Sequence, residues 1–450
     1  KKKKKKKKKK IDLRLLTIPL IVLTIGLGFF VEQSDFVPII SQFGIFFFLY
    51  IFIFKYTNKK NKIIFFVGVS VLLRLILLFA IPNLSDDVYR FIWDGRLLIN
   101  GHNPFDYSPI YYIENNISIP GINEALYTKL NSPKYFTIYP PIAQSVFASA
   151  CWLFPNSIFG SVVVMKTFLF LSELGSLLFI KKLLHRFQLP EKNILLYALN
   201  PLIIIELCGN LHFEAVMICF LLAGVFFLVE SKLIFSAFSI ALSIASKLLP
   251  LMFLPFFIKR LGLKKSIQYF SIVGIVTVLL FIPLLSGEFF NNFRTSLDLY
   301  FQKFEFNASI YYTIRWVGYQ MVGFNWIQSA GPTLGVIVLL GIVAITFLEK
   351  NINWKDLFGK MLFAICLYIS LATVVHPWYV SLPIVLSLFT RYRFPILWSG
   401  LIFLTYINYS YETYSENLWV VGIEYVLVYS FLFYEMTKTH SFFQLKNQSK

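Results

Sequence analysis

Two adjacent carboxylates, Asp86 and Asp87, follow the third apolar run of the sequence. Like charges this close together, beside a medium of low dielectric constant, raise the pKa of one of the two groups. A carboxylate with a raised pKa suits the removal of a proton near neutral pH. The alternative is structural, with Ser85 or Asp86 capping a helix that continues through Arg96. The two interpretations are compatible, because a cap uses only one carboxylate.

Two cationic side chains lie inside apolar runs, where a charge is costly. Lys247 directly precedes the apolar residues 248–250, and Arg74 lies within the third apolar run. Lys247 either belongs to a functional site or extends its long side chain to the membrane surface. For Arg74 we expect a hydrogen bond between buried helices.

The elements that position these side chains are membrane helices. Of the 450 residues, 57% are hydrophobic and only 14% are charged, whereas about a quarter of the residues are charged in ordinary soluble domains. Apolar runs of spanning or near-spanning length recur along the chain, for example at 13–31, 63–81, 161–180 and 332–348. The sequence therefore predicts an all-α polytopic membrane protein with 11–14 transmembrane helices, and it excludes a water-soluble fold.

The charge of the chain points to membrane topology and not to nucleic acid. Residues 1–10 are all lysine, typical of a tag or placeholder, and without their ten charges the net charge of +19 falls to +9. The remaining basic residues lie in short tracts between apolar runs, so we expect no nucleic-acid partner.

The four cysteines lie in apolar segments without metal-type spacing. We expect residues 11–450 to form a single transmembrane domain, with the run at 13–31 retained as a helix.

Short basic loops belong on the cytoplasmic side of a membrane. They lie at 55–62, 181–192, 259–265, 350–360 and 391–393. The alternation of loops then places both termini in the cytoplasm and residues 82–138 in a long outer loop, provided that segment 139–155 does not cross or that a neighbouring helix is broken. We prefer a re-entrant or interfacial helix at 139–155. The same alternation places all the polar candidates at the outer ends of helices, namely Asp86, Asp87, His212, Glu214, Lys247 and His376.

The order of residues after the third apolar run resembles the first outer loop of the GT-C superfamily of membrane glycosyltransferases, which use polyprenyl-phosphate sugars. It is most similar to bacterial polyprenyl-phosphate-mannose-dependent mannosyltransferases, which have an Asp-Asp-x-Tyr-Arg-x-x-x-Asp-Gly run. Here that run is 86–95, followed by Asn103-Pro104-Phe105, with Phe where the family has Tyr, and by Tyr139-Pro140-Pro141.

Further matches continue to Tyr379. They are Asn200-Pro201, Glu206, the segment 209–214, the segment 246–250 and His376-Pro377-Trp378-Tyr379. Glu214 stands where the family has Asp. The resemblance thus covers about Arg74 to Tyr379, and it implies a GT-C-like helix bundle.

The resemblance implies an inverting glycosyltransferase that moves a hexose, with mannose favoured, from a polyprenyl-phosphate sugar to an acceptor hydroxyl. The acceptor would be a glycan or glycolipid of the cell envelope. The enzyme would lie in the bacterial inner membrane, with its site facing the periplasm or exterior. No cofactor is assigned, and a divalent metal ion remains an open alternative.

The resemblance also implies roles for particular residues. One of Asp86 and Asp87 would be the catalytic base, while Lys247, Arg90 and Arg96 would bind the donor phosphate. The residues expected to bind substrate are Tyr89, Trp93, Asp94, Tyr139, His212, Glu214, His376 and Trp378. For the two histidines, simple packing or metal binding are alternatives.

A transporter or flippase of a lipid-linked or amphipathic substrate is the main competing interpretation. Transporters place their decisive polar residues near the bilayer midplane, commonly on broken helices in two matching halves. Here the acidic pair lies at a helix end, and the sequence shows no two-fold repeat. A scaffold subunit without chemistry leaves the ordered run of outward polar motifs unexplained.

Overall fold

The computed structural model describes residues 12–350 and 352–444, so the poly-lysine segment 1–10 lies outside the described residues. The described chain is helical. The first half contains η1 (Leu13–Leu16), α1 (Thr17–Phe29), α2 (Phe36–Tyr56), α3 (Lys60–Leu77), α4 (Asp87–Ile99), α5 (Pro109–Glu114), α6 (Glu124–Tyr127), α7 (Pro141–Leu153), α8 (Ile158–Arg186), η2 (Glu191–Ile194), α9 (Leu195–Ala198), η3 (Ile203–Gly209), α10 (Glu214–Val229) and α11 (Leu233–Ser246).

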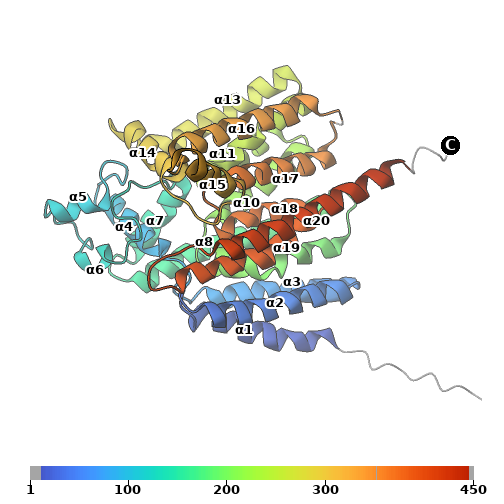
Figure 1. The fold of residues 1–450 in the computed structure, drawn as a ribbon, viewed down its shortest axis with the longest axis horizontal. Coiled ribbons are helices and arrows are strands. Elements are labelled where there is room, and N and C mark those ends of the chain that lie inside the picture. Colours follow the sequence, from blue (N-terminus) through green and yellow to red (C-terminus); the bar gives the residue numbers. More distant parts are fainter. Residues whose placement is uncertain (1–11, 351, 445–450) are drawn as a thin grey trace, which may run out of the picture.

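The second half continues the same pattern. It contains η4 (Leu249–Phe253), α12 (Pro255–Leu261), α13 (Leu263–Phe281), η5 (Ile282–Leu284), α14 (Phe289–Gln302), α15 (Ile310–Val322), α16 (Ile327–Leu348), α17 (Trp354–Leu371), η6 (Pro377–Val380), α18 (Ser381–Ser387), α19 (Phe394–Leu401), η7 (Ile402–Tyr409) and α20 (Leu418–Gln444). The long helices run side by side along one direction of the molecule (Figure 1).

Several of these helices can cross a bilayer. Five are long and apolar enough by themselves, and a sixth span results if the bent pair Glu191–Ala198 and Ile203–Gly209 is counted as one. Six more of the described helices are apolar but only 10–17 residues long. The prediction of an all-α polytopic membrane protein is therefore confirmed, while the number of 11–14 crossings stays a prediction.

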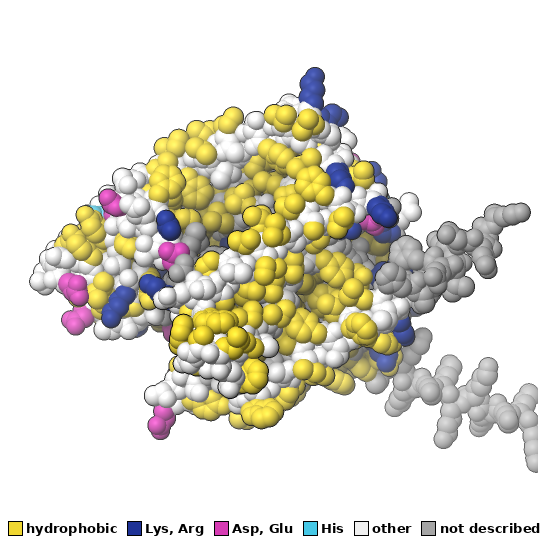
Figure 2. All heavy atoms as spheres, turned by 45° about the horizontal axis from the view of Figure 1, so that its top comes forward, with side chains coloured by type: hydrophobic (Ala, Val, Ile, Leu, Met, Phe, Trp, Pro, Cys, Tyr) yellow, Lys and Arg dark blue, Asp and Glu magenta, His cyan; other side chains and the backbone are white. Residues whose placement is uncertain are grey.

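The molecular surface has the pattern of an integral membrane protein. Figure 2 shows a broad hydrophobic belt around the middle of the molecule, with Lys and Arg side chains concentrated toward the right-hand edge. Large apolar side chains in this belt are exposed, such as Phe48 at 67% and Leu339 at 60%. Exposed apolar area of this extent is stable only against lipid or another protein.

A lobe made of α4 to α7 projects from one end of the bundle (Figure 1). Helix α4 packs closely on α7, because Gly95 has no side chain: a Cβ atom there would lie 2.5 Å from the carbonyl oxygen of Phe147. The Phe91 and Phe147 rings stack beside this contact, with centroids 4.5 Å apart. Helix α7 has 13 residues, or about 20 Å, so it is too short to cross the hydrocarbon core, about 30 Å thick. The packing of α4 on α7 at Gly95 fixes the start of α4 relative to the bundle.

Candidate functional site

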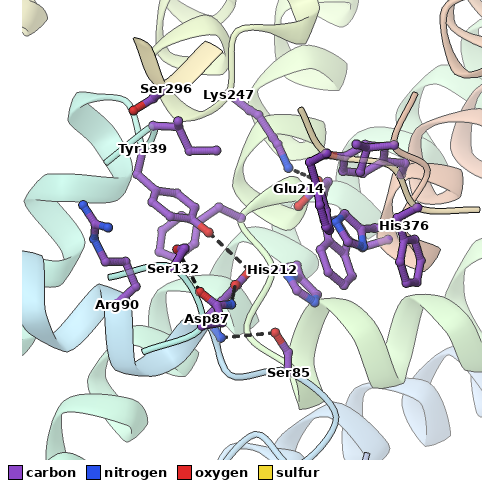
Figure 3. Close-up of a pocket in the computed structure, with 18 of the residues that line it drawn as sticks. Ser85, Asp87, Arg90, Ser132, Tyr139, His212, Glu214, Lys247, Ser296 and His376 are labelled. Atoms are coloured by element: carbon purple, nitrogen blue, oxygen red, sulfur yellow. Dashed lines mark hydrogen bonds and ion pairs between the residues drawn. The ribbon is translucent and has the colours of Figure 1, made fainter. Parts of the chain in front are cut away.

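A cavity of about 840 Å³, here called the central cavity, lies where the lobe meets the helix bundle. Its wall combines segments that are far apart in the sequence. It is lined by Asp86, Asp87, Arg90, Tyr139, His212, Glu214, Lys247, His376 and Trp378, among others. Figure 3 shows the Asp87, Tyr139, His212, Glu214 and Lys247 side chains around a common space. The structure thus brings together most of the polar residues that the sequence singled out.

Neither carboxylate of the acidic pair is used as a helix cap. Asp86 occupies the N-cap position of α4, but its side chain makes no capping hydrogen bond. Instead, the backbone N–H of Asp87 donates to the hydroxyl of Ser85 over 3.4 Å. Of the two caps considered, Ser85 or Asp86, only the Ser85 side chain bonds to the helix start, and the helix continues past Arg96 to Ile99.

The two carboxylates have different surroundings. Asp87 accepts hydrogen bonds from the amide of Asn131 over 2.9 Å and from the hydroxyl of Tyr139 over 3.2 Å. Asp86 is exposed to the cavity side, and no described residue donates a hydrogen bond to its side chain. Partial burial, with the neighbouring charge of Asp87, raises the pKa of Asp86 above its ordinary value. Asp86 is thus the carboxylate that can accept a proton more readily.

An ion pair lies on another wall of the cavity, where α11 ends and α10 begins. The Lys247 ammonium group donates to Glu214, the first residue of α10. The Lys247 side chain is 27% exposed, whereas that of Glu214 is 2% exposed. Lys247 also lies over the Tyr379 ring, 5.2 Å from its centroid. Lys247 therefore presents its positive charge to the cavity instead of extending away from the protein.

Two histidines enclose the Trp378 ring. The His212 ring stacks on one face with centroids 3.6 Å apart, and the His376 ring lies 4.4 Å away, nearly parallel. Burial, with the nearby His212 and Lys247, lowers the pKa of His376 to about 3. His376 is therefore neutral at pH 7, so it can offer a hydrogen bond but not a positive charge.

His212 is held by a short run of unusual backbone. Glu206, from the π-helix η3, places a carboxylate oxygen 3.3 Å from Nε2 of His212 and accepts hydrogen bonds from Asn210 and Tyr406. Leu211 between them has a φ of 68° although it is not glycine. A π-helix and a bulky residue in the left-handed region are both rare and occur often at functional sites.

Four predicted residues do not line the central cavity, and one of them, Tyr89, lines a smaller hollow beside it. Trp93 is buried and packs against the rings of Tyr112 and Tyr127. The Arg96 side chain points to the loop between α5 and α6, where it donates to the carbonyl oxygen of Gly121 over 2.6 Å. Asp94 is fully buried in the lobe. Trp93, Arg96 and Asp94 therefore hold the lobe together, and the structure does not bring them to the substrate space.

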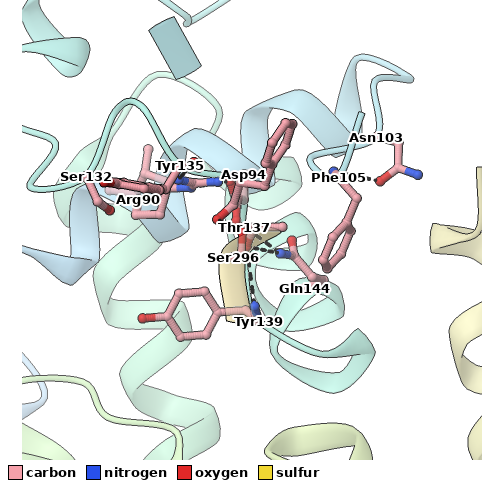
Figure 4. Close-up of polar contacts among 12 residues, drawn as sticks. Arg90, Asp94, Asn103, Phe105, Ser132, Tyr135, Thr137, Tyr139, Gln144 and Ser296 are labelled. Atoms are coloured by element: carbon pink, nitrogen blue, oxygen red, sulfur yellow. Dashed lines mark hydrogen bonds and ion pairs between the residues drawn. The ribbon is translucent and has the colours of Figure 1, made fainter. Parts of the chain in front are cut away.

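Arg90 lines the cavity, but its guanidinium group is engaged elsewhere. Its Nε donates to Asp94 over 2.8 Å, and a second nitrogen donates to the Tyr135 carbonyl oxygen over 2.9 Å. Asp94 accepts a further hydrogen bond from Gln144 over 3.0 Å (Figure 4). This network fixes the 131–139 segment, which carries Asn131 and Tyr139. Of the three predicted phosphate-binding cations, Lys247 has the freest approach to the cavity.

Sequence reasoning missed several residues of the site. Lys303 and Phe306 line the cavity because the 303–306 segment pairs with the strand-like segment before His376: the N–H of Phe306 donates to the Thr373 carbonyl over 3.0 Å. No feature of the sequence predicts this backbone pairing. Glu206 belonged to the matched motifs but had no assigned role. The signal that could have identified it is a carboxylate inside an apolar run, which the structure buries.

The residues described by the structure contain no group of three His, Cys, Asp or Glu side chains close enough to hold a metal ion. We therefore assign no metal ligand.

Comparison with known proteins agrees with this geometry. Residues 47–261 match the family model described as α-(1→6)-mannopyranosyltransferase, N-terminal domain. The chain is also 26% identical over 144 residues to α-(1→6)-mannopyranosyltransferase B of Corynebacterium glutamicum. That match covers 32% of this chain and 23% of the relative. The expected resemblance to membrane mannosyltransferases is confirmed.

Proposed function

From this similarity and the central cavity, we propose that the chain is an inverting mannosyltransferase of the membrane. It would move mannose from a polyprenyl-phosphate donor to a hydroxyl of a glycan or glycolipid, at the outer face of the inner membrane. The observation that carries the proposal is the central cavity, which joins an unengaged carboxylate, a cation and aromatic rings at one end of a membrane bundle.

Asp86 is the general base of the proposed reaction. The acceptor hydroxyl gives its proton to the Asp86 carboxylate as its oxygen attacks the anomeric carbon. A positioned base of this kind contributes about 10²- to 10⁴-fold to the rate. Asp87, whose oxygens accept hydrogen bonds from Asn131 and Tyr139, lies beside the reacting carbon and stabilises the positive charge that develops there.

Lys247 stabilises the leaving group. As the bond from the anomeric carbon to the phosphate oxygen breaks, the electron pair passes to the phosphate, and a fixed cation nearby stabilises that charge. Figure 3 shows Lys247 across the cavity from Asp87, the sequence neighbour of the proposed base Asp86. This separation suits in-line displacement, with base and leaving group on opposite faces of the sugar, and hence inversion.

The isoprenoid chain of the donor needs an apolar path from the bilayer. The residues that follow Lys247 supply one: Leu248, Leu249 and Met252 line the same cavity, and Leu251 is 46% exposed. A phosphate bound at Lys247 would thus lie where the polar cavity meets an apolar wall. The lipid would reach the site sideways, without leaving the membrane.

The orientation follows from charge. Lys and Arg side chains concentrate toward one edge of the hydrophobic belt (Figure 2), and such side chains favour the cytoplasmic face. The lobe and the central cavity lie at the opposite end, which faces outward in this proposal, with both termini in the cytoplasm.

Reconstitution tests the proposal. Purified protein in liposomes is given radiolabelled polyprenyl-phosphate-mannose and a mannoside acceptor, and the product linkage is determined by NMR. We expect transfer with inversion, so that a β-linked donor gives an α-linked product. Movement of intact donor across the bilayer, with no glycosidic bond broken, would instead identify a transporter or flippase.

A further inference from the structure

A second hollow, here called the outer hollow, opens on the lobe beside the central cavity. It has a volume of about 380 Å³ and is lined by Asp86, Tyr89, Thr128, Lys129, Leu130 and Asn131. Only Asp86 and Asn131 belong to the walls of both spaces. The candidate base therefore lies at the boundary between an enclosed site and a hollow open to the outside.

The two spaces differ in chemistry. The central cavity has apolar side chains such as Leu248, Leu249 and Met252 in its wall. The outer hollow has one apolar side chain, Leu130, and otherwise a carboxylate, a phenol, a hydroxyl, an ammonium group and an amide. An isoprenoid chain would gain little there, because apolar burial is its main source of binding energy.

A sugar fits such a lining. Its hydroxyls can bond to the amide of Asn131, the hydroxyl of Thr128 and the ammonium group of Lys129, and its C–H faces can pack on the Tyr89 ring. Lys129 lies over that ring, 5.1 Å from its centroid, so the aromatic platform and the cation form one surface. The volume also lies in the range of small-molecule sites, about 300–1,000 Å³.

We propose that the outer hollow is the acceptor subsite, which binds the terminal sugar of a hydrophilic glycan and directs one of its hydroxyls to Asp86. This inference rests on the proposed function. The acceptor oxygen forms the new bond to the anomeric carbon and loses its proton to Asp86. The bond from that carbon to the phosphate oxygen breaks, and its electron pair leaves with the polyprenyl phosphate toward Lys247.

The subsite separates the two substrates physically. The lipid donor enters from the bilayer into the central cavity, and the glycan enters from outside into the outer hollow. They meet only at Asp86 and Asn131. Asn131 connects them chemically as well, because it donates to Asp87 and also lines the hollow.

Filling the hollow tests the proposal. Thr128 is exposed, and in Thr128→Trp the indole occupies the hollow. The matched control is Ala125→Trp, an exposed position on the short helix α6, which ends directly before Thr128, and Ala125 lines neither space. A second pair is Lys129→Ala against Lys134→Ala, where Lys134 is exposed on the same loop and lines neither space.

Each protein is assayed in proteoliposomes with polyprenyl-phosphate-mannose and two acceptors, free α-(1→6)-mannobiose and octyl α-mannoside. We expect Thr128→Trp to raise the acceptor KM at least about 10-fold, a loss of about 1.4 kcal/mol, with the donor Kd unchanged. Lys129→Ala should raise it less, and both controls should match wild type. The two acceptors distinguish a free glycan from a membrane-anchored one.

The outcomes are separable. Wild-type transfer with an unchanged acceptor KM in Thr128→Trp would place the acceptor elsewhere and overturn the subsite alone. A rise in the donor Kd of that variant would assign the hollow to the donor and also overturn it. Absence of any mannose transfer by wild type would remove the proposed function, and the subsite with it.

Discussion

Two groups of charged side chains in this protein differ in how completely other protein groups bind them. Deep in the bundle, Arg74 donates to Glu173 over 2.9 Å and to the Ala198 carbonyl over 2.7 Å, while Tyr197 donates to Glu173 over 2.5 Å. Both charged side chains are fully buried. This confirms the expected helix–helix hydrogen bond of Arg74, and it shows charges paired by protein groups alone.

The central cavity is the opposite case. Asp86 receives no hydrogen bond from any described residue, and the Lys247 side chain stays 27% exposed beside Glu214. In the deep pair, protein groups bind both charges and leave one guanidinium nitrogen of Arg74, Nη2, without a partner among the described residues, whereas in the cavity the whole Asp86 carboxylate lacks such a partner. The difference teaches that a charge in a membrane protein marks function when its partners are incomplete.

The strongest test of this comparison is Asp86→Asn. The isosteric amide keeps the shape of the site but cannot accept the proton, so we expect turnover to fall about 10²- to 10⁴-fold. Donor binding and melting temperature should not change. The matched variant Asp87→Asn should lose less, and a larger loss there would transfer the role of base to Asp87.

Glu173→Gln tests the deep pair. The charge of Arg74 would remain buried without its counter-ion, so we expect a loss of about 3 kcal/mol in the free energy of unfolding, measured by denaturation in detergent. The control is Glu230→Gln, which breaks the exposed pair with Arg186 and should cost less than about 1 kcal/mol. Equal losses of unfolding free energy in Glu173→Gln and Glu230→Gln would contradict the special role of the buried pair.

Lys247→Met removes the proposed phosphate cation while keeping an apolar side chain of similar length. A charge-assisted hydrogen bond contributes about 1.5–3 kcal/mol, so kcat/KM for the donor should fall about 10- to 100-fold. Lys264→Met, at an exposed position outside the cavity, should leave it unchanged. An unaltered kcat/KM in Lys247→Met would mean that another group binds the phosphate.

Glu206→Gln weakens the support of His212 without touching the cavity wall. We expect kcat to fall about 10-fold, because a neutral amide replaces the carboxylate that lies 3.3 Å from Nε2 of His212. If Glu206 acts through His212, the same change in a His212→Ala background should have little further effect. Additive losses in that double-mutant cycle would show that Glu206 acts by another route.

The smallest effect concerns pH. Because the pKa of Asp86 is raised and the base must be deprotonated, activity should fall as pH falls through that pKa, above the ordinary aspartate value of about 3.9. In Asp87→Asn one cause of the raised pKa is gone, so the acid limb of the kcat/KM profile should move to lower pH. If the acid limb of Asp87→Asn stays at the same pH, the group that titrates in it is not Asp86.

Much of the fold could be predicted because its cause is local. The apolar runs near 161–180 and 332–348 became α8 (Ile158–Arg186) and α16 (Ile327–Leu348), since the bilayer dictates both length and composition. The short segment after Tyr139 became α7, a helix of 13 residues. A broken neighbouring helix was one of the sequence alternatives, but its place before η3 was not foreseen, because a π-helix is stabilised by contacts such as that of Glu206 with Tyr406, 200 positions away.

The site was predicted in part, for a related reason. Asp86, Lys247 and His376 were identified because charged or polar groups in apolar surroundings are conspicuous in a sequence. Trp93 lies in the same motif as Asp86, and Arg96 directly follows it, but helix α4 turns both away from the cavity and into the lobe. Adjacency in a motif does not determine which side of a helix a residue occupies relative to distant neighbours.

The sequence by itself determined that the chain is a membrane helix bundle and that its polar motifs occur at helix ends, because hydrophobic length and charge are properties of short segments. Only the tertiary structure decided which of two adjacent carboxylates is left without partners. That choice depends on Asn131 and Tyr139, which the lobe brings to Asp87 from 44 and 52 positions away. Hydrogen-bond partners are selected by packing, and packing is a property of the whole chain.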